Sequence, residues 1–468
     1  MAILDEDRLF PTDPVVRGIA RDLYAGVRDL PILSPHGHTD PRWFAENAAF
    51  PDPARLFVTP DHYVFRMLHS QGIPLEDLGV PRADGGKSEQ DPRRIWRLFA
   101  SHYHLFRGTP SRLWIDHALQ EVFGVTERLS AQTADAVYDH VADCLGQAAF
   151  RPRALFERFN IEAIATTESA IDDLKWHAMI RDSGWGGTVI TAYRPDSVVD
   201  PEVDGFAENV ARMGEMAGED ATTWGGYLAA HRSRRAFFRS FGATSSDHGH
   251  PTARTEDLSQ SEAAQLFEKA LRGACSGEEA DRFRGHMLTE MARMSLDDGL
   301  VLQIHPGSFR NHSAGMLHSF GRDRGYDIPT RTDYVTALRP LLNAVGERAD
   351  LTVIVFTLDE TSYARELAPL AGVYPALKLG PAWWFHDSYE GMMRFRQMTT
   401  ESAGFYNTVG FNDDTRAFCS IPARHDVARR VDCAYLATLV ATGRLDADEA
   451  PEVAHDLAYR LAKAAYRL

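Results

Sequence analysis

The chain has 468 residues, 44% of them hydrophobic, which is the composition of an ordinary globular protein that can form a full core. It carries 50 basic and 66 acidic residues, and therefore a formal net charge of −16 at pH 7. This balance argues against nucleic acid and anionic membranes as partners, because both require basic surface, although a few arginines in a pocket could still bind a small anion.

The first predicted elements are a helix over residues 14–28 and a short strand after it. Apolar side chains recur at every fourth position of the helix, which gives it one apolar face. The strand is the apolar run 30–33, and it ends at Ser34-Pro35, where the backbone must leave a sheet.

His36 and His38 follow this strand directly. Residues two apart in an extended backbone point to the same side, so both imidazoles can face one point at the mouth of the strand. There they could hold a metal ion or polarise an oxygen. Two further His-x-His pairs are interpreted as surface or core residues: His102 and His104 in a predicted helix, and His248 and His250 in a loop or the core.

The next part of the chain is predicted to be helical. Residues 61–67, which include Tyr63, are expected to begin a helix. From residue 71, a stretch rich in Gly, Pro and charge leads into helical patterns, and no strand-like run appears for about 80 residues. We interpret 71–155 as a helical insertion that covers the mouth of the main domain or makes a subunit contact. The catalytic domain then comprises residues 1–70 and 156–468.

From residue 156 onward, short apolar runs alternate with helical stretches. Together with the first strand they number eight, and eight strands separated by helices predict an α/β fold of the (β/α)8 TIM-barrel type. The runs are 30–33, 161–168, 188–195, 236–248, 300–307, 351–358, 374–380 and 406–414, and two closing helices are expected near 423–441 and 446–467.

In such a barrel the chemistry lies at the carboxyl ends of the strands. This sequence gathers His, Asp and Arg at those positions, which a barrel with a purely structural role does not need. The candidates in chain order are His36, His38, Arg194, Asp247, His248, His305, Arg310, Trp383, Trp384, Asp413, Asp414 and Arg416.

The same residues also have structural interpretations. These are a surface ion pair for Arg194, capping for Asp247, Asp413 and Asp414, and core packing for Trp383 and Trp384, one of which could instead stack on a sugar face. His305 precedes Pro306-Gly307, a turn that would aim its ring inward, and this favours a functional role.

The four cysteines, Cys144, Cys275, Cys419 and Cys433, have neither metal-type nor redox spacing, so a reducing compartment is expected. The acidic N-terminal residues lack the apolar core of a signal peptide, and no stretch approaches 18 apolar residues. The chain is therefore expected to be cytoplasmic.

Five segments, taken together, resemble the uronate isomerase (glucuronate isomerase) family, a divergent branch of the amidohydrolase superfamily. The resemblance covers nearly the whole chain and extends to the segments 414–418 and 420–425. The five are Pro35-His-Gly-His-Thr-Asp40, Asp61-His-Tyr63, Tyr193-Arg-Pro-Asp196, Gln303-Ile-His-Pro-Gly-Ser-Phe-Arg-Asn311 and Gly380-Pro-Ala-Trp-Trp-Phe385.

The resemblance implies a distorted (β/α)8 barrel with a helical insertion. It also implies the interconversion of D-glucuronate with D-fructuronate and of D-galacturonate with D-tagaturonate. The sixth run ends without a histidine, unlike the wider superfamily, so at most one divalent metal, with zinc favoured, is expected on His36, His38 and Asp414. The functional positions implied are His36, His38, Tyr63, Arg194, Asp247, His305, Arg310, Trp383, Asp414 and Arg416.

An aldose–ketose isomerisation through a cis-enediol needs a base, electrophiles at two oxygens and an anchor for the distal carboxylate. Arg194 or Arg310 is the expected anchor, because arginine binds a carboxylate in a bidentate manner. Arg416 and the histidine pair would polarise the sugar oxygens. Tyr63 acting with Asp414 is the expected base, with Arg416 as the cation that lowers the phenol pKa and Asp414 alone as the competing base. Asp247 and His305 would assist ring opening.

Two other functions remain open at this point. A mononuclear metal-dependent hydrolase acting on a lactone or amide would need the histidine pair and Asp414, but would give Tyr63 no special role. A non-catalytic sugar-acid binding protein would need the arginines and tolerate the loss of Asp414. The expected partner is a small uronate, and the helical insertion is consistent with a homo-oligomer.

Overall fold

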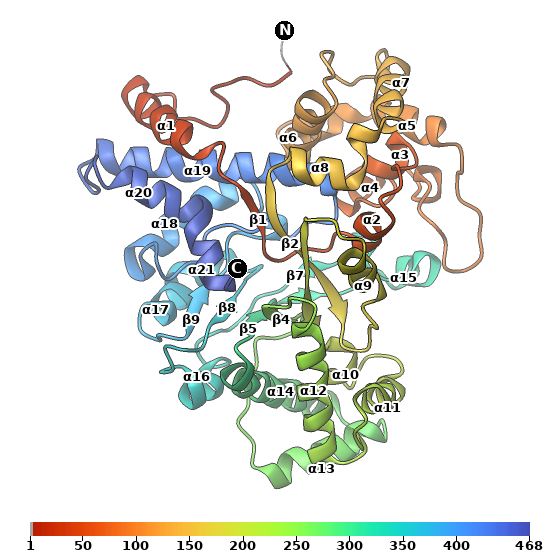
Figure 1. Ribbon diagram of the computed structural model, residues 1–468, viewed down its shortest axis with the longest axis vertical. Coiled ribbons are helices and arrows are strands. Elements are labelled where there is room, and N and C mark those ends of the chain that lie inside the picture. The colour runs from red at the N-terminus through yellow and green to blue at the C-terminus, as the bar shows by residue number, and fades with distance from the viewer. Residues whose placement is uncertain (1–2) are drawn as a thin grey trace.

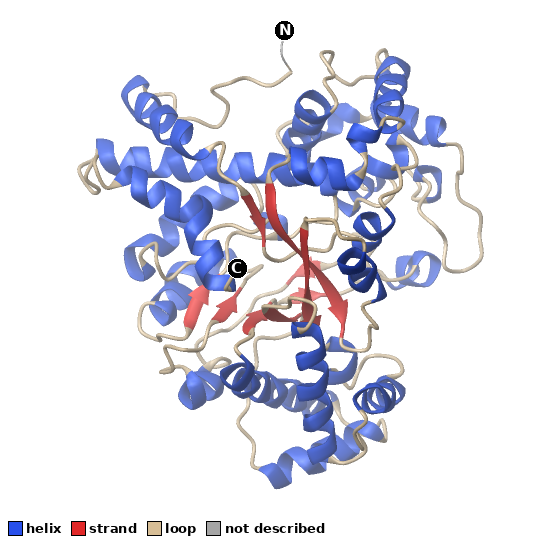
Figure 2. Cartoon of the chain, viewed as in Figure 1, coloured by secondary structure: helices blue, strands red, loops and turns tan. Residues whose placement is uncertain are grey.

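A curled, seven-stranded parallel sheet lies at the centre of the computed structural model, which describes residues 3–468 (Figures 1 and 2). The strand order follows the chain, so each strand pairs with its neighbours in sequence through a helical crossover. The strands are β1 (Ile32–Ser34), β2 (Ile161–Ser169), β3 (Thr188–Arg194), β4 (Ser245–His248), β5 (Val301–Ile304), β8 (Val353–Val355) and β9 (Leu377–Leu379).

The run 406–414, predicted as the eighth strand, forms one parallel bridge between Thr408 and Leu379 and no regular strand. The Leu379 N–H donates to Asn407 O at 2.9 Å, and the Val409 N–H donates to Leu379 O at 3.1 Å. Gly410 then has a φ of 72°, which turns the backbone out of the extended conformation. Pairing therefore stops after one bridge, and the part of the chain that the structure describes contains a curled parallel sheet that fits a TIM-like barrel.

One further strand prediction needs correction, and one hairpin was not predicted. The run predicted at 236–248 begins in a helix, because 236–239 complete α12 (Trp224–Arg239) with Phe238 packed in the core. An additional antiparallel hairpin, β6 (Ser308–Phe309) with β7 (Ile328–Pro329), follows β5 and had no signal in the sequence pattern.

Helices surround the sheet, and the first of them, α1 (Pro14–Val27), matches the predicted helix at 14–28. Asp13 caps it by accepting from the backbone N–H groups of Val15 and Val16, and Pro14 occupies its first position. The other helices before residue 160 are α2 (Pro41–Glu46), α3 (Pro53–Phe57), α4 (His62–His69), η1 (Glu76–Leu78), α5 (Pro92–Ser101), η2 (Tyr103–Phe106), α6 (Pro110–His117), η3 (Ala118–Val122), α7 (Ala134–Leu145), η4 (Ala148–Phe150) and α8 (Pro152–Arg158).

Helical crossovers and two C-terminal helical stretches complete the chain. They are α9 (Lys175–Asp182), α10 (Asp196–Val199), α11 (Phe206–Ala217), α13 (Gln260–Leu271), α14 (Gly277–Asp298), α15 (Ala314–Phe320), α16 (Arg339–Val345), η5 (Glu360–Ser362), η6 (Tyr363–Leu367), α17 (Ala368–Ala371), η7 (Trp384–His386), α18 (Tyr389–Ala403), η8 (Phe418–Ser420), α19 (Ile421–Ala441), α20 (Ala450–His455), η9 (Asp456–Arg460) and α21 (Leu461–Tyr466). No helix within residues 3–468 is both long and apolar enough to cross a membrane.

The segment 71–155 is helical, as the sequence pattern indicated, and it packs beside the amino-terminal part of the sheet (Figure 1). Its buried residues, such as Trp96, form one apolar cluster with Phe44 and Phe57 from the preceding helices and with Ile161 of β2. A shared cluster fixes the position of this segment relative to the strand ends. The division into a barrel domain and an insertion stays a prediction.

Candidate functional site

Side chains from the carboxyl ends of several strands converge at one rim of the sheet. His36 and His38 follow β1, Asp247 lies in β4, and His305 follows β5. Asp414 comes from the loop after the Thr408 bridge, and this loop is held against the loop after β1 because the His38 N–H donates to Thr415 O at 3.0 Å. The first predicted strand and the last predicted run are thereby brought together.

Asp414 Oδ1 lies between the two histidines. Its distance is 3.5 Å to His36 Nε2 and 3.3 Å to His38 Nε2. Asp414 has a φ of 41°, in the left-handed region that few non-glycine residues adopt, and Oδ1 is buried without a hydrogen-bond donor among residues 3–468. A strained backbone and an unpaired buried carboxylate oxygen together indicate a functional position.

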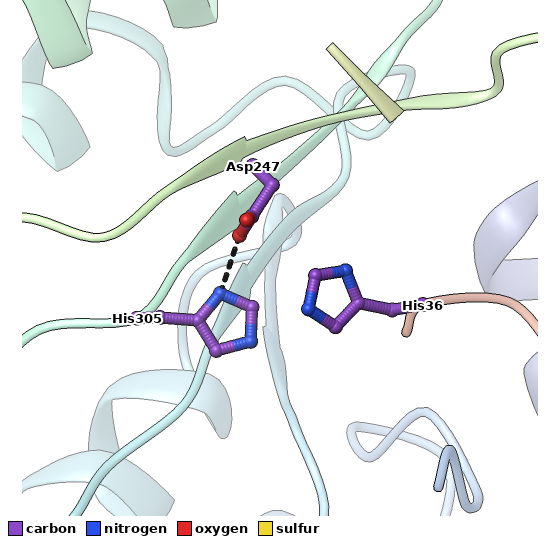
Figure 3. A group of neighbouring side chains, drawn as sticks. All are labelled: His36, Asp247 and His305. Atoms are coloured by element: carbon purple, nitrogen blue, oxygen red, sulfur yellow. Dashed lines mark hydrogen bonds and ion pairs between the residues drawn. The ribbon is translucent and has the colours of Figure 1, made fainter. Parts of the chain in front are cut away.

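A second group shares His36 (Figure 3). His305 Nδ1 donates to Asp247 Oδ1 at 2.6 Å, and the His305 ring stacks on the His36 ring with centroids 4.7 Å apart. Arg194 Nη1 lies 3.0 Å from Oδ2 of this fully buried carboxylate and forms an ion pair with it, although Oδ2 accepts no hydrogen bond within the described chain. His305 Nε2 is buried and has no hydrogen-bond partner within the described chain, which leaves it available to a ligand.

The residues present fit a single metal ion better at Asp414 than at Asp247. Donors bound about 2.0–2.1 Å from a tetrahedral ion are separated by roughly 3.3 Å, close to the two distances at Asp414 Oδ1 and longer than most N–H···O bonds. Asp247 Oδ1 is already bound by His305, and Oδ2 has no hydrogen-bond partner in the described chain but forms an ion pair with Arg194. Three groups in the described chain bring potential ligand atoms within 4.8 Å of one another, and of these His36, His38 and Asp414 have the spacing that fits a metal ion best.

The ionisation of these groups also suits a cation. Burial lowers the pKa of His36 and lowers that of His38 to about 3, so both imidazoles are neutral at pH 7. Burial alone would raise the pKa of Asp414, but the neighbouring His36 and His38 bring it below its ordinary value. Neutral imidazoles beside a carboxylate are the protonation states that metal binding requires.

Tyr63 lies in the first turn of α4, whose N-terminus is capped by Asp61 Oδ1 accepting from the Tyr63 N–H at 2.8 Å. Burial raises the pKa of Tyr63 above its ordinary value, although the guanidinium of Arg424, 5.4 Å from the ring centroid, opposes the change. The phenol is therefore protonated at neutral pH. Arg416, expected to be the cation beside Tyr63, instead lies 3.6 Å from Asp323 with about half of its side chain exposed.

The two candidate anchors differ in how many donors they have free. Arg194 Nε donates to Asp196 Oδ2 at 2.8 Å and Nη1 faces Asp247, so only Nη2 is uncommitted. Arg310 Nη1 donates to Asp327 Oδ2 at 2.8 Å, while Nε and Nη2 have no partner within residues 3–468. Arg310 is thus the arginine with two nitrogens available to a carboxylate.

Trp383, predicted either as core or as a sugar platform, is 7% exposed and packs edge-on against His305 with centroids 4.8 Å apart. It forms a wall of the His305 site. Its neighbour Trp384 faces the guanidinium of Arg310, whose central carbon is 5.3 Å from the ring centroid.

His248 and His250 are buried, in agreement with the loop or core interpretation, and they lie near Asp196. The carboxylate of Asp196 is already bound by Arg194 and accepts from the Gly249 N–H at 3.2 Å. A supporting role for this cluster behind Arg194 accounts for these contacts. His102 is half-buried and His104 exposed, and neither belongs to a cluster of potential metal ligands in the described chain.

Sequence reasoning missed three residues behind Tyr63, namely Trp114, Asp387 and Arg424. Their only signal was the position of Arg424 in the segment 420–425, which was noted but given no role. Asp387 and Trp114 have no local pattern that marks them, because their contacts depend on how distant segments pack.

We expect the protein to lose stability as pH falls below about 6.5. Burial lowers the pKa of His231 well below its ordinary value, and His231 is fully buried. The unfolded chain takes up a proton below pH 6.5 that the folded chain refuses, so the free energy of unfolding should fall by about 1.4 kcal/mol per pH unit for each such histidine. Urea unfolding between pH 5 and 7 measures the slope, and His231→Gln should make it shallower; an unchanged slope would contradict this assignment.

Comparisons with known proteins agree over the full length of the chain. The family described as glucuronate isomerase matches residues 12–466. A uronate isomerase of Mesorhizobium japonicum is 69% identical over 468 residues, covering 100% of both chains, and one of Rhizobium meliloti is 68% identical, covering 100% of this chain and 99% of its own. The crystal structure of glucuronate isomerase from Caulobacter crescentus superposes with a TM-score of 0.97 at 61% identity, covering 99% of this chain and 97% of the other.

Proposed function

Because the chain belongs to the uronate isomerase family, we propose that it interconverts D-glucuronate with D-fructuronate, and D-galacturonate with D-tagaturonate, by proton transfer through a cis-enediol. The observation that carries the chemistry is the buried Asp414 carboxylate between two neutral imidazoles at the rim. The family match favours isomerisation over the hydrolase and binding-protein alternatives.

Asp414 is the proposed base. Its lowered pKa keeps it ionised at neutral pH, whereas the raised pKa of Tyr63 keeps the phenol protonated. Asp414 would remove the proton from C2 of the open-chain aldose and return it to C1 of the enediol. Tyr63 would donate its proton to the C1 oxygen as the enediol forms and take one back from the C2 hydroxyl as C1 is protonated, so the phenol ends the cycle protonated. Asp414 and Tyr63, first predicted to act jointly as the base, thus act on carbon and on oxygen respectively.

His305 is proposed to assist ring opening, because the sugar enters mostly as a closed hemiacetal. Its Nδ1 is bound to Asp247, which fixes the ring and leaves Nε2 to take the proton of the anomeric hydroxyl and return it to the ring oxygen as the bond from that oxygen to C1 breaks. Arg194 would hold Asp247 in place, and Arg310 would bind the uronate carboxylate. Trp383 would keep water away from His305, and Arg416 would polarise an oxygen of the substrate.

His36, His38 and Asp414 are the residues that would hold one divalent metal, and zinc suits a donor set of two nitrogens and one oxygen. When bound, such an ion acts as a Lewis acid toward sugar oxygens. The two histidines would orient the same oxygens through their ring nitrogens. We further propose that 406–414 serves as the eighth strand of a distorted (β/α)8 barrel, with 71–155 as an insertion into it.

Incubation with D-glucuronate in deuterated water tests this function. Ketose formation with deuterium appearing at C2 of recovered D-glucuronate supports an isomerase that exchanges the transferred proton with solvent. Ketose formation without exchange would leave the isomerase in place but require a shielded proton or a hydride shift. Binding with no turnover on either uronate would overturn the proposal in favour of a binding protein.

Removing the metal should leave the fold of the protein intact. After treatment with a chelator and dialysis, we expect the metal content to fall and the fold to persist, because the three candidate ligands lie at the rim and not in the apolar clusters. Elemental analysis and circular dichroism check these two results. The His38→Asn variant should retain less metal than the parent protein, and equal metal content in the two would exclude this donor set.

A further inference from the structure

A buried ion pair lies directly behind Tyr63. Arg424, in the first turn of α19, pairs through Nη1 with Asp387 Oδ2, which comes from the segment between η7 and α18. Both side chains are almost inaccessible, with exposures of 2% and 4%. Arg424 Nε also donates to Ser420 Oγ at 3.2 Å, so the guanidinium is held from two sides.

The guanidinium also lies over two aromatic rings. Its central carbon is 3.7 Å from the ring centroid of Trp114 and 5.4 Å from that of Tyr63. The Trp114 and Tyr63 rings contact one another edge to face, with centroids 5.5 Å apart. Trp114 belongs to α6, within the helical segment 71–155, so this segment contacts the ring of Tyr63 through a buried side chain.

Arg424 also contacts the backbone beside the proposed base. Its Nη1 donates to Asp413 O at 3.3 Å, immediately before Asp414. One planar group therefore touches the ring of Tyr63 and the chain that carries Asp414. Arginine can make both contacts because its guanidinium combines a flat face with several in-plane donors.

Stability alone gives little reason for this arrangement. An ion pair buried to this extent is often no more stabilising than apolar residues of the same volume, since both charges lose their hydration. Burial raises the pKa of Asp387 to about 6 despite the attraction of Arg424, which reflects that cost. Asp387 Oδ1 has no hydrogen-bond partner among residues 3–468, so the pair is not fully compensated.

We propose that Arg424, held by Asp387 and stacked on Trp114, is a positioning residue that fixes Tyr63 and Asp414 relative to one another. Through Trp114, the helical segment 71–155 then contributes to turnover as well as to packing. This inference rests on the proposed isomerase function, because it assigns these residues an effect on the roles of Tyr63 and Asp414.

Arg424→Lys is the primary test, because lysine retains the charge and the pairing with Asp387 but loses the flat face and the fork of donors. We expect kcat on D-glucuronate to fall by about 10²-fold, the size of effect that a misplacement of roughly 1 Å produces, with KM within about threefold of the parent value. Trp114→Phe should retain most of kcat because a ring face remains, whereas Trp114→Ala should resemble Arg424→Lys.

Helix α6, which carries Trp114, also provides a matched control for Arg424→Lys. Arg112 stacks on Tyr103 with 4.1 Å to the ring centroid and donates to Asp116 Oδ2 at 2.7 Å, which repeats the combination of arginine, aromatic ring and carboxylate away from the rim residues. Arg112→Lys should therefore lower stability to a similar extent and leave kcat close to that of the parent. Equal losses of kcat in the two lysine variants would overturn the proposal.

A readout without substrate separates this inference from the proposed function. Fluorotyrosine incorporation gives a ¹⁹F NMR signal for Tyr63 that is identified by its loss in Tyr63→Phe. We expect this signal to shift in Arg424→Lys and to stay in place in Arg112→Lys. If the parent protein turns over no uronate, the function fails whatever the signal does. If the parent is active and Arg424→Lys leaves both kcat and the Tyr63 signal unchanged, the positioning role is wrong.

Discussion

Asp414→Asn should reduce kcat for uronate isomerisation by at least about 10²-fold while the protein remains folded. The amide has nearly the shape of the carboxylate but cannot accept a proton, and general-base catalysis contributes about 10²–10⁴-fold. Because Oδ1 has no donor in the described chain, the substitution breaks no hydrogen bond of that oxygen. Steady-state kinetics on D-glucuronate and D-galacturonate measure the loss.

Asp413→Asn is the control for this variant. Asp413 is adjacent in the chain and more deeply buried, but its Oδ2 accepts from His425 Nε2 at 3.1 Å and it lies in no group of candidate metal ligands in the described chain. We expect it to lower thermal stability and to keep most of the turnover at a temperature where it is folded. A comparable fall in turnover for both variants would point to a disturbed loop and not to a lost base.

The pH dependence of the parent enzyme provides an independent check. A base whose pKa lies below its ordinary value loses activity only when the solution is acidic enough to protonate it, so kcat should stay flat on the acidic side until well below pH 5. Tyr63 acting as the ionised base would instead give activity that rises toward alkaline pH, because its pKa is raised. The direction of the profile therefore decides between the two residues.

The strand runs and the rim could be predicted because they depend on local patterns. Apolar runs bounded by turns identified seven strands of the sheet, and His36 and His38 were placed at the end of the first one because they follow that run directly. The outcome for the eighth run, 406–414, was harder to predict. Its sequence resembles that of a strand, but it pairs at one position only before Gly410 turns the chain. Whether a run forms a full strand depends on its neighbours as well as on its composition.

The partners of the candidate catalytic side chains could not be predicted, because they come from segments far apart in sequence. Arg416 follows Asp414 by two residues and was therefore expected to be the cation beside Tyr63. The backbone turns at Asp414, which has a left-handed conformation, and the side chain of Arg416 lies beside Asp323 instead. Arg424 occupies that place from a helix that begins later. Spacing along the chain indicates which residues share a strand end, but not which of them face each other.

Arg310→Met should reduce kcat/KM for D-glucuronate by about 10²-fold, mostly through KM. Two free guanidinium nitrogens can form a bidentate, charge-assisted contact with the uronate carboxylate, and losing such a contact costs about 2–5 kcal/mol. Methionine preserves the unbranched apolar stem of the side chain and removes the guanidinium. The hairpin should persist, because Asp327 Oδ1 still accepts from the Asn311 N–H at 2.7 Å.

The Arg194→Lys variant tests whether Arg194 binds the uronate carboxylate or holds Asp247 and His305 in place. Arg194 already binds Asp196 and Asp247, and Asp247 in turn holds His305, so its replacement should lower kcat more than it raises KM. Comparing each variant on D-glucuronate and on a neutral aldose makes the distinction sharper. Arg310→Met should lose the preference for the charged substrate, because only that substrate presents a carboxylate to the missing guanidinium. If Arg194→Lys loses the preference instead, the carboxylate binds beside β3 and Arg310 serves the hairpin alone.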